Sequence, residues 1–298
     1  MNFEKSQIGW YDEECAYSKK EKGVGYEKMK KISLFLFSVI MIFTLAACGA
    51  GESEESKQKQ NGEAQGGSEY NLVEDGKFTF AASGEFRPFS YTGPSGEMEG
   101  FDIDVANAIA EELGLEPNQK KFKFASIVEG VKTGRFDAAV ASHTITPERQ
   151  EEVDFSTPYY YSGAQIFVRP DSDVETLEDL KGKEIAVSKG STYAKFASQV
   201  TDKVQSYDSD VVALQSLDKG RHDAVITDFL TGKEAMGQGL NIEGKEMIER
   251  SEQAVAVAKD NEKLLEAINE AIKKLREDGT LTEISKKYFG EDITTKPE

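Results

Sequence analysis

One five-residue pattern occurs twice in this chain, and the repetition limits what the chain can fold into. Residues 134–138 read GRFDA and residues 220–224 read GRHDA. At both places a helical pattern ends, the chain turns, and an apolar strand runs to a polar tip. Four identical residues out of five can arise by coincidence among similar strand–helix units. Two similar lobes explain the repetition better, and a two-lobed structure is the prediction.

Short apolar strands alternate with helical patterns from residue 77 onward. Helices are expected over residues 102–113, 127–132, 193–200, 211–217 and 264–275, and strands over residues 77–82, 137–142, 184–188 and 223–227. This alternation predicts an α/β fold in which each lobe is a mostly parallel sheet flanked by helices. Open sheets of this kind bind ligands at the carboxyl ends of their strands, so we expect a shared crevice there.

The composition excludes several classes of protein. A hydrophobic content of 38% and a mean hydropathy of −0.51 fit a globular protein better than one with many membrane spans. The net charge of −18 argues against nucleic-acid binding, because nothing in so acidic a chain neutralises phosphates at scale. Both cysteines lie near the N-terminus and only two histidines occur, so we expect no disulfide framework, no metal site and no cofactor.

The N-terminal region has the features of an export signal. Lysines at 30–31 precede an apolar run over 32–45, and two alanines then precede Cys48. The run is shorter than the about 20 residues that a spanning helix needs. Residues 45–48 resemble a bacterial lipobox, and that likeness implies cleavage before Cys48 and lipidation of its thiol. The alternative is a short membrane anchor or a buried helix.

The segments around this signal have different expected roles. Residues 1–28 are polar and charged, and we interpret them as a mis-assigned extension, with translation starting at Met29 and a signal peptide over 29–47. Residues 48–70 combine the lipidated cysteine with a tether that is rich in Gly, Ser, Glu, Gln and Lys and cannot bury a core. The mature protein is therefore expected on the outer face of a cell membrane, held by its lipid.

Several short motifs in the folded part occur in a characteristic order. They are GEFRPF at 84–89, GFDIDV at 100–105, GRFD at 134–137, TITPER at 144–149, DFSTPY at 154–159, GK at 182–183, DGT at 278–280 and KYFG at 287–290. With this set the chain resembles the bacterial solute-binding proteins of polar amino-acid ABC transporters, over about residues 72 to 292. Each motif is weak alone, whereas the ordered set is specific.

That resemblance implies a periplasmic-binding-protein clamshell whose two crossover strands act as a hinge. It places residues 72–163 and 256–298 in the first lobe and residues 164–255 in the second. The implied function is to capture an amino acid by closing the cleft and to deliver it to a membrane-embedded ABC permease. The protein is expected to act as a monomer.

The family likeness also assigns residues to the ligand. Arg149 corresponds to the position that clamps the α-carboxylate, since a planar guanidinium can form two parallel hydrogen bonds. Thr144 and Thr192 stand at strand ends and would complete that clamp. Asp228 corresponds to the acceptor of the α-ammonium, and Ser142 to a residue that offers it a backbone carbonyl. Without the family context, Arg149 and Asp228 are ordinary helix-start residues.

Two aromatic residues, Phe86 and Phe124, align with positions that flank the ligand and exclude water; a core role is the alternative for Phe86. His143 is expected to be a buried neutral histidine rather than a ligand contact. Ser83 stands where relatives for basic amino acids often carry an acid, and Glu85 may face the solvent instead of replacing it. This disfavours basic ligands and leaves polar, acidic and sulfur-containing amino acids such as cystine open.

Three other functions fit parts of the pattern. A few clamshells of this type resemble cyclohexadienyl dehydratases, for which Glu85 or Glu97 would be the acid, but no nucleophile is paired with a base. A ligand-sensing receptor domain would continue into a membrane helix and a signalling domain. A lytic transglycosylase would need a catalytic module. We expect a binding protein and not an enzyme.

Overall fold

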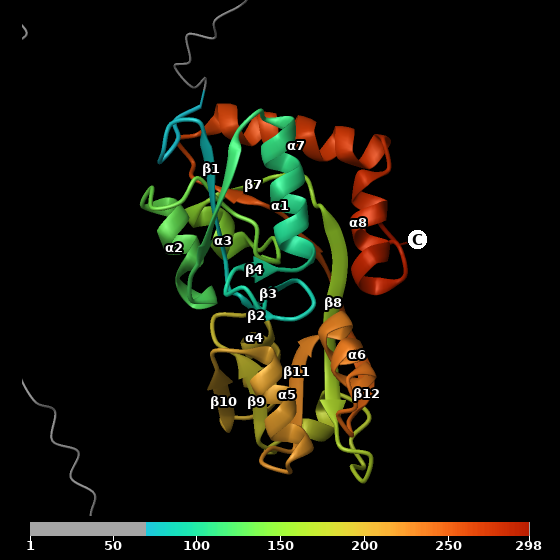
Figure 1. Ribbon diagram of the computed structural model, residues 1–298. Coiled ribbons are helices and arrows are strands. Elements are labelled where there is room, and N and C mark those ends of the chain that lie inside the picture. Colours follow the sequence, from blue (N-terminus) through green and yellow to red (C-terminus); the bar gives the residue numbers. More distant parts are fainter. Residues whose placement is uncertain (1–69, 298) are drawn as a thin grey trace, which may run out of the picture. The chain divides into compact units, whose positions relative to one another are not determined.

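The computed structural model describes residues 70–297, and most of the strands found there gather into two five-stranded sheets (Figure 1). We call each sheet with its helices a lobe. The first sheet, in the order β5-β1-β6-β13-β7, contains β5 (Glu116–Lys121), β1 (Lys77–Ala82), β6 (Ala138–Ala139), β13 (Ala256–Val257) and β7 (Asp154–Phe155). The second, in the order β10-β9-β11-β8-β12, contains β10 (Val204–Tyr207), β9 (Ile185–Ser188), β11 (Ala224–Asp228), β8 (Tyr160–Val168) and β12 (Glu243–Gln253).

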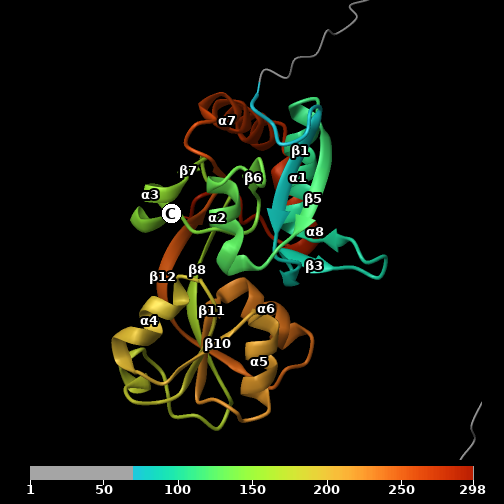
Figure 2. The same ribbon diagram turned by 90° about the vertical axis from the view of Figure 1, so that its left-hand side faces the viewer.

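Both sheets have the same pattern of strand directions. The first three strands of each order are parallel, whereas the fourth is antiparallel to both of its neighbours. Four strands of each sheet therefore point the same way, which confirms the α/β fold with two lobes and mostly parallel sheets. The reversed strands, β8 and β13, are the ones that the chain enters on crossing from the other sheet. In Figure 2, β8 and β12 run between the lobes.

The repeated GRxDA pattern makes the same turn in both lobes. Gly134 follows α2 (Ile127–Lys132) and Gly220 follows α5 (Asp210–Asp218), and their φ angles are 69° and 72°. A residue with a Cβ atom is strained in this left-handed conformation, whereas glycine adopts it readily. The glycine therefore ends the helix and turns the chain back toward the sheet.

The aspartate of each copy joins that turn to the parallel strand beside the one that follows it, β1 in the first sheet and β9 in the second. The Asp137 carboxylate accepts the N–H of Thr79, within β1, at 2.6 Å. The Asp223 carboxylate accepts the N–H of Glu184, directly before β9, at 2.8 Å. Equivalent bonds at equivalent places show that the repetition reflects two lobes of like construction and not chance.

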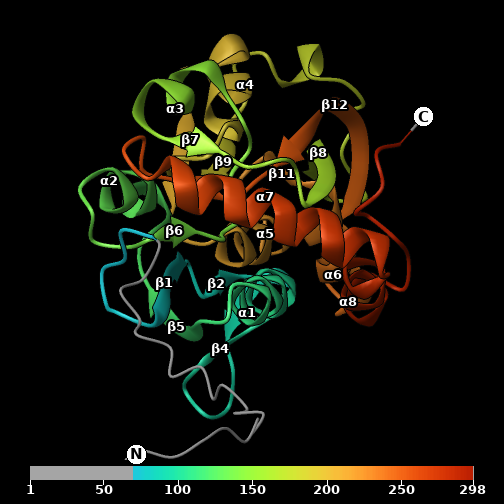
Figure 3. The same cartoon turned by 90° about the horizontal axis from the view of Figure 1, so that it is seen from above.

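Helices cover the sheets with the apolar faces that their sequences predict. Leu264, Ile268, Ile272 and Leu275 of the long helix α7 are buried against the first lobe, and Figure 3 shows α7 crossing that lobe from above. That helix, α7, spans Glu262–Glu277, and the helices not yet given are α1 (Phe101–Glu112), α3 (Pro147–Glu152), α4 (Tyr193–Val200), α6 (Phe229–Gly237) and α8 (Thr280–Phe289).

The second sheet is apolar on both faces. Along β11, Ile226 packs in one cluster with Ile185 and Val187, whereas Val225 packs in another with Phe167 and Leu214. Successive side chains of a strand point to opposite faces, so this sheet is covered by helices on each side. Rigid strands with two buried faces hold their carboxyl ends, where the site lies, in fixed positions.

One expected strand is shorter than its sequence pattern suggested. Residues 137–142 were expected to be extended, but only Ala138–Ala139 pair as a strand. The chain leaves the sheet after Val140, and Ser142 has a φ of 57°. A small sheet of β2 (Glu85–Phe86), β3 (Ser90–Thr92) and β4 (Met98–Glu99) follows β1. Short 3₁₀ turns at Phe124–Ser126 and Glu178–Leu180 complete the elements.

Some expectations concern residues outside the described part of the chain. These are the extension over 1–28, the signal peptide over 29–47, Cys48 and all of the tether but its last residue. Among residues 70–297, no helix has both the length and the apolar character needed to cross a membrane.

Candidate functional site

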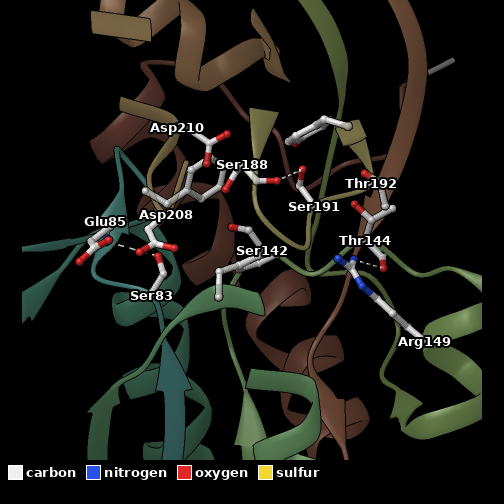
Figure 4. Close-up of a pocket in the computed structure, with 13 residues that line it drawn as sticks. Ser83, Glu85, Ser142, Thr144, Arg149, Ser188, Ser191, Thr192, Asp208 and Asp210 are labelled. Carbon is white, nitrogen blue, oxygen red and sulfur yellow. Dashed lines mark hydrogen bonds between the residues drawn. The ribbon is translucent and has the colours of Figure 1, made fainter. Parts of the chain in front are cut away.

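A cavity lies where strand ends from both lobes meet (Figure 4). The first lobe contributes residues that follow β1, β5 and β6, and the second contributes the end of β9 and residues that follow β9 and β10. The wall consists of Ser83, Glu85, Phe86, Phe124, Ser142, Thr144, Arg149, Ser188, Ser191, Thr192, Tyr193, Asp208 and Asp210. This is the crevice that the strand–helix alternation predicted.

The wall includes six of the seven residues expected to bind ligand, and Asp228 is the exception. The six are Phe86, Phe124, Ser142, Thr144, Arg149 and Thr192. In Figure 4, Arg149, Thr144 and Thr192 stand at one end, whereas Ser83, Glu85 and Asp208 stand at the other. One end of the cavity is therefore cationic and the other carries carboxylates.

Arg149 is held so that its guanidinium faces the cavity. It lies in the first turn of α3, where Pro147 occupies the helix start and the Thr146 hydroxyl accepts the Arg149 N–H at 3.2 Å. Its Nη1 donates to the Thr144 carbonyl at 2.8 Å, and its Nη2 donates to the Gly190 carbonyl at 3.2 Å.

The charge of Arg149 persists in this setting. Burial lowers its pKa to about 10, so the guanidinium stays protonated at neutral pH. Its central carbon lies 5.8 Å from the centre of the Phe124 ring. A guanidinium has five N–H donors, and the bonds to Thr144 and Gly190 leave donors for an anionic ligand.

Ser142 has a strained backbone that two other segments of the first lobe hold in place. Its N–H donates to the Tyr159 hydroxyl at 3.0 Å, and its Oγ donates to Asp102 Oδ2 at 2.7 Å. The Tyr159 hydroxyl donates to Asp102 Oδ1 at 2.7 Å. Left-handed backbone in a residue other than glycine costs about 1–2 kcal/mol, so these bonds offset a real strain at the cavity wall.

His143 does not belong to the cavity wall. It is 1% exposed, and its ring stacks on that of Phe124 with a centroid distance of 4.5 Å. Burial, with the nearby Arg149 charge, lowers its pKa well below 6.5. Its Nδ1 has no hydrogen-bond partner within residues 70–297. The expected buried neutral histidine is found here, behind an aromatic wall residue.

Two buried carboxylates of the second lobe lie on or near the wall. Asp210 lines the cavity and accepts the Thr227 hydroxyl at 2.6 Å, and burial raises its pKa. Asp228 caps helix α6 by accepting the Leu230 N–H at 2.9 Å. Burial raises its pKa to about 7, and the Asp210 charge adds to that shift.

Asp210 was missed by the sequence reasoning. A signal was present, because Ser209 followed by an acidic residue is a common helix start, and Ser209 does cap α5 by accepting the Val212 N–H at 3.4 Å. The sequence analysis began that helix at residue 211, so Asp210 was not recognised as a residue at the helix start near the crevice.

The far end of the cavity carries charges of both signs. Glu85 pairs with Lys121 at 3.3 Å within the first lobe, and Asp208 pairs with Lys123 at 3.3 Å across the two lobes. Glu85 is among the wall residues, and its side chain is also 44% exposed to solvent, as expected. Glu97 is exposed and absent from the wall, so it is not the acid of an enzymatic site here.

Direct contacts between the lobes flank the cavity. The Ser209 hydroxyl donates to the Glu85 carbonyl at 3.0 Å, and the Thr231 hydroxyl donates to the Arg87 carbonyl at 3.1 Å. On the other side of Arg149, Lys195 pairs with Glu148 at 2.6 Å. With the Arg149–Gly190 bond, these contacts describe a closed arrangement of the lobes around a space that suits a small dipolar ligand.

The sequence and the fold both match known binding proteins. The family model for bacterial extracellular solute-binding proteins, family 3, matches residues 78–291. The L-cystine-binding protein TcyJ of Escherichia coli K12 is 36% identical over 230 residues, which cover 75% of this chain and 86% of that protein. The L-cystine-binding protein TcyA of Bacillus subtilis 168 is 33% identical over 271 residues, or 89% of this chain and 100% of that protein.

Among solved structures, an ancestral arginine-binding protein bound to glutamine superimposes with a TM-score of 0.69 and 36% identity. The match covers 73% of this chain and 100% of the ancestral protein.

Proposed function

The chain belongs to family 3 of the bacterial extracellular solute-binding proteins, and from this we propose that its cavity binds the zwitterionic head of a polar α-amino acid for delivery to an ABC permease. Its relatives are binding proteins of transporters, so the chain is a solute-binding protein and not an enzyme. The observation that carries the proposal is a partly buried guanidinium from one lobe and the buried Asp210 carboxylate from the other at a single cavity, with the buried Asp228 carboxylate close to Asp210.

The α-carboxylate of the ligand is assigned to Arg149. The guanidinium is already fixed by the Thr144 and Gly190 carbonyls, so it loses little side-chain freedom when a carboxylate arrives. Thr144 and Thr192 line the same end, and their hydroxyl and N–H groups complete the clamp. Phe86 and Phe124 flank the ligand and exclude water, which strengthens each charged contact.

The α-ammonium is assigned to the second-lobe carboxylates and to the Ser142 carbonyl. Asp210 stands on the wall, and Asp228, the residue expected from the family, lies close enough for the two charges to interact. The ammonium group of the ligand would be the positively charged partner of these two buried carboxylates. The ligand would thus bridge the lobes, and its differential affinity for the closed form would drive closure.

The lobe boundaries expected from the family remain part of this proposal. Residues 72–163 with 256–298 would move as one lobe, and residues 164–255 as the other. The change of sheet between β7 and β8, and again between β12 and β13, supports hinges at these places.

The side chain of the ligand is assigned to the end that carries Ser83, Glu85 and Asp208. Their acidity, balanced by Lys121 and Lys123, favours a polar or dipolar side chain. L-cystine and L-glutamine are the first candidates, since the similar proteins named above are named for cystine or were solved with glutamine, whereas the serine at position 83 disfavours L-arginine, for which the ancestral protein is named.

A thermal-shift panel of the common L-amino acids with L-cystine tests the proposal. A ligand present at a hundred times its Kd should raise the free energy of unfolding by about 2.7 kcal/mol. Cystamine is a matched control for L-cystine, because it keeps the disulfide and the amines but lacks the carboxylates. A panel in which no amino acid raises the melting temperature would contradict amino-acid binding.

We also propose that Cys48 carries a lipid and tethers the protein to the outer face of the membrane. The basic pair, the apolar run and the small residues before Cys48 support this assignment. In a bacterial expression host, the unaltered chain should be recovered with membranes, and Cys48→Ser should not incorporate labelled palmitate. Equal palmitate labelling of both proteins would contradict lipidation at Cys48.

A further inference from the structure

The backbone of Ser142 is unusual within residues 70–297, because it is the one described residue other than glycine with a positive φ, 57°. It stands on the cavity wall and is 9% exposed. Such strain persists only where the surroundings hold it, and it tends to gather at binding sites. The question is what holds Ser142 in this conformation.

The Asp102 carboxylate is at the centre of the contacts around Ser142. Asp102 is 0% exposed, lies in the first turn of α1, and accepts two hydroxyls, from Ser142 at 2.7 Å and from Tyr159 at 2.7 Å. The Tyr159 hydroxyl in turn accepts the Ser142 N–H at 3.0 Å. Both the side chain and the backbone of Ser142 are thereby tied to one buried carboxylate.

We propose that Asp102 is a positioning residue, which holds Ser142 in the left-handed conformation that turns its carbonyl toward the ammonium group of the ligand. The inference rests on the proposed function, since it concerns the same amino-acid head. Asp102 is absent from the cavity wall and acts only through Ser142 and Tyr159. The ligand meets a carbonyl that is already in place.

The choice of serine at 142 follows from this role. Glycine would adopt a φ of 57° without strain but would have no side chain to tie down. Serine is strained, yet its Oγ reaches the carboxylate. If the tie is lost, the backbone relaxes, and the binding-competent fraction falls. The apparent Kd rises by the inverse of that fraction.

The test measures affinity by calorimetry with L-cystine, L-glutamine and L-arginine. For each of these amino acids that binds the unaltered protein, Asp102→Ala should weaken binding by about tenfold. The loss should be similar for all of them, because they share the ammonium group. Asp137→Ala is the matched control. Asp137 is also a buried first-lobe carboxylate with two partners, the N–H groups of Val73 and Thr79, but it is absent from the wall.

A second substitution, to glycine at position 142, distinguishes a role of Asp102 in positioning Ser142 from a general role in stability. Adding Ser142→Gly to Asp102→Ala should recover most of the lost affinity, since glycine adopts the conformation without the tie. Should Asp102→Ala fold poorly, Ser142→Ala and Ser142→Gly make the same comparison with Asp102 intact. The alanine variant should then bind roughly fivefold more weakly than the glycine variant, because it keeps the strain of the Cβ atom and loses the tie.

The outcomes are distinct. The inference is overturned if Asp102→Ala binds as tightly as Asp137→Ala, if glycine restores nothing, or if a crystal structure of Asp102→Ala shows residue 142 still left-handed. Loss of affinity with rescue, together with a residue 142 that leaves the left-handed region, supports it. An unaltered chain that binds no amino acid refutes the proposed function, and the φ of residue 142 still decides whether Asp102 holds it.

Discussion

Replacing Arg149 by glutamine should weaken amino-acid binding by about 100-fold or more, the range seen when one partner of a buried charge pair is removed. The carboxylate of the ligand would enter a closed cavity whose wall, within the described residues, contains no other cation. An unpaired buried anion is costly, so the loss exceeds the value of the hydrogen bonds alone. Titration calorimetry on the purified protein, with the amino acid that gives the largest thermal shift, measures the change.

Two variants make the Arg149 result specific. Arg149→Lys keeps the charge but loses the planar fork, so its affinity should fall between those of the unaltered protein and the glutamine variant. Arg169→Gln is the matched control, because Arg169 also donates to backbone carbonyls, of Leu217 and His222, but lies away from the cavity. Equal affinity of Arg149→Gln and Arg169→Gln would remove the basis for an amino-acid head at this end.

Much of the fold could be predicted because its signals are local. The helices at Ile127–Lys132 and Tyr193–Val200 and the strand at Lys77–Ala82 have the bounds that periodicity indicated. The GRxDA repetition also rests on local chemistry, namely a glycine that ends a helix and an aspartate that reaches the next strand. The short apolar strands of the second sheet were enough to predict that the sheet is flanked by helices.

The parts that could not be predicted depend on contacts between distant segments. Asp102 is a good helix-start residue, and its sequence context does not reveal that its carboxylate meets Ser142, 40 positions away. The strand pattern over 137–142 continues through Ser142, yet the backbone turns there because Tyr159 and Asp102 bind it. Asp210 reaches the wall through the packing of α5 on β11, a relation that no motif records.

The family likeness placed the cationic end of the site more sharply than the acidic end. Arg149 and Thr144 belong to one motif of six residues, so the local backbone fixes their positions relative to each other. The two carboxylates assigned to the ammonium are Asp210, which follows β10, and Asp228, the last residue of β11, and only the assembled sheet brings them close. The wall contains Asp210, whereas the sequence pointed to Asp228, and variants of both are needed to divide their roles.

Removing the second-lobe carboxylates is expected to be the other large effect. Asp210→Asn and Asp228→Asn should each weaken amino-acid binding by about tenfold or more, and the double variant by about 100-fold or more, because the ammonium then lies buried without a counter-charge. Asp223→Asn is the control, since this second-lobe aspartate binds the Glu184 N–H outside the cavity. Full affinity of Asp228→Asn beside a weakened Asp210→Asn would assign the contact to Asp210 alone.

The pH dependence of affinity gives an independent measure of the Asp228 role. Burial raises the pKa of Asp228 to about 7 in the ligand-free protein, so below that pH its carboxyl group is mostly protonated and neutral. An ammonium ligand needs the ionised form, and each pH unit below 7 should then lower the affinity by up to about tenfold as the proton must be released. Above pH 7 the group is already ionised and the affinity should level off. Asparagine at 228 cannot titrate, so calorimetry from pH 5 to 8 should show a flatter profile for Asp228→Asn. An equally steep profile would mean that another buried carboxyl group sets the pH dependence, and Asp102 and Asp210, whose pKa values burial also raises, are the groups to replace next.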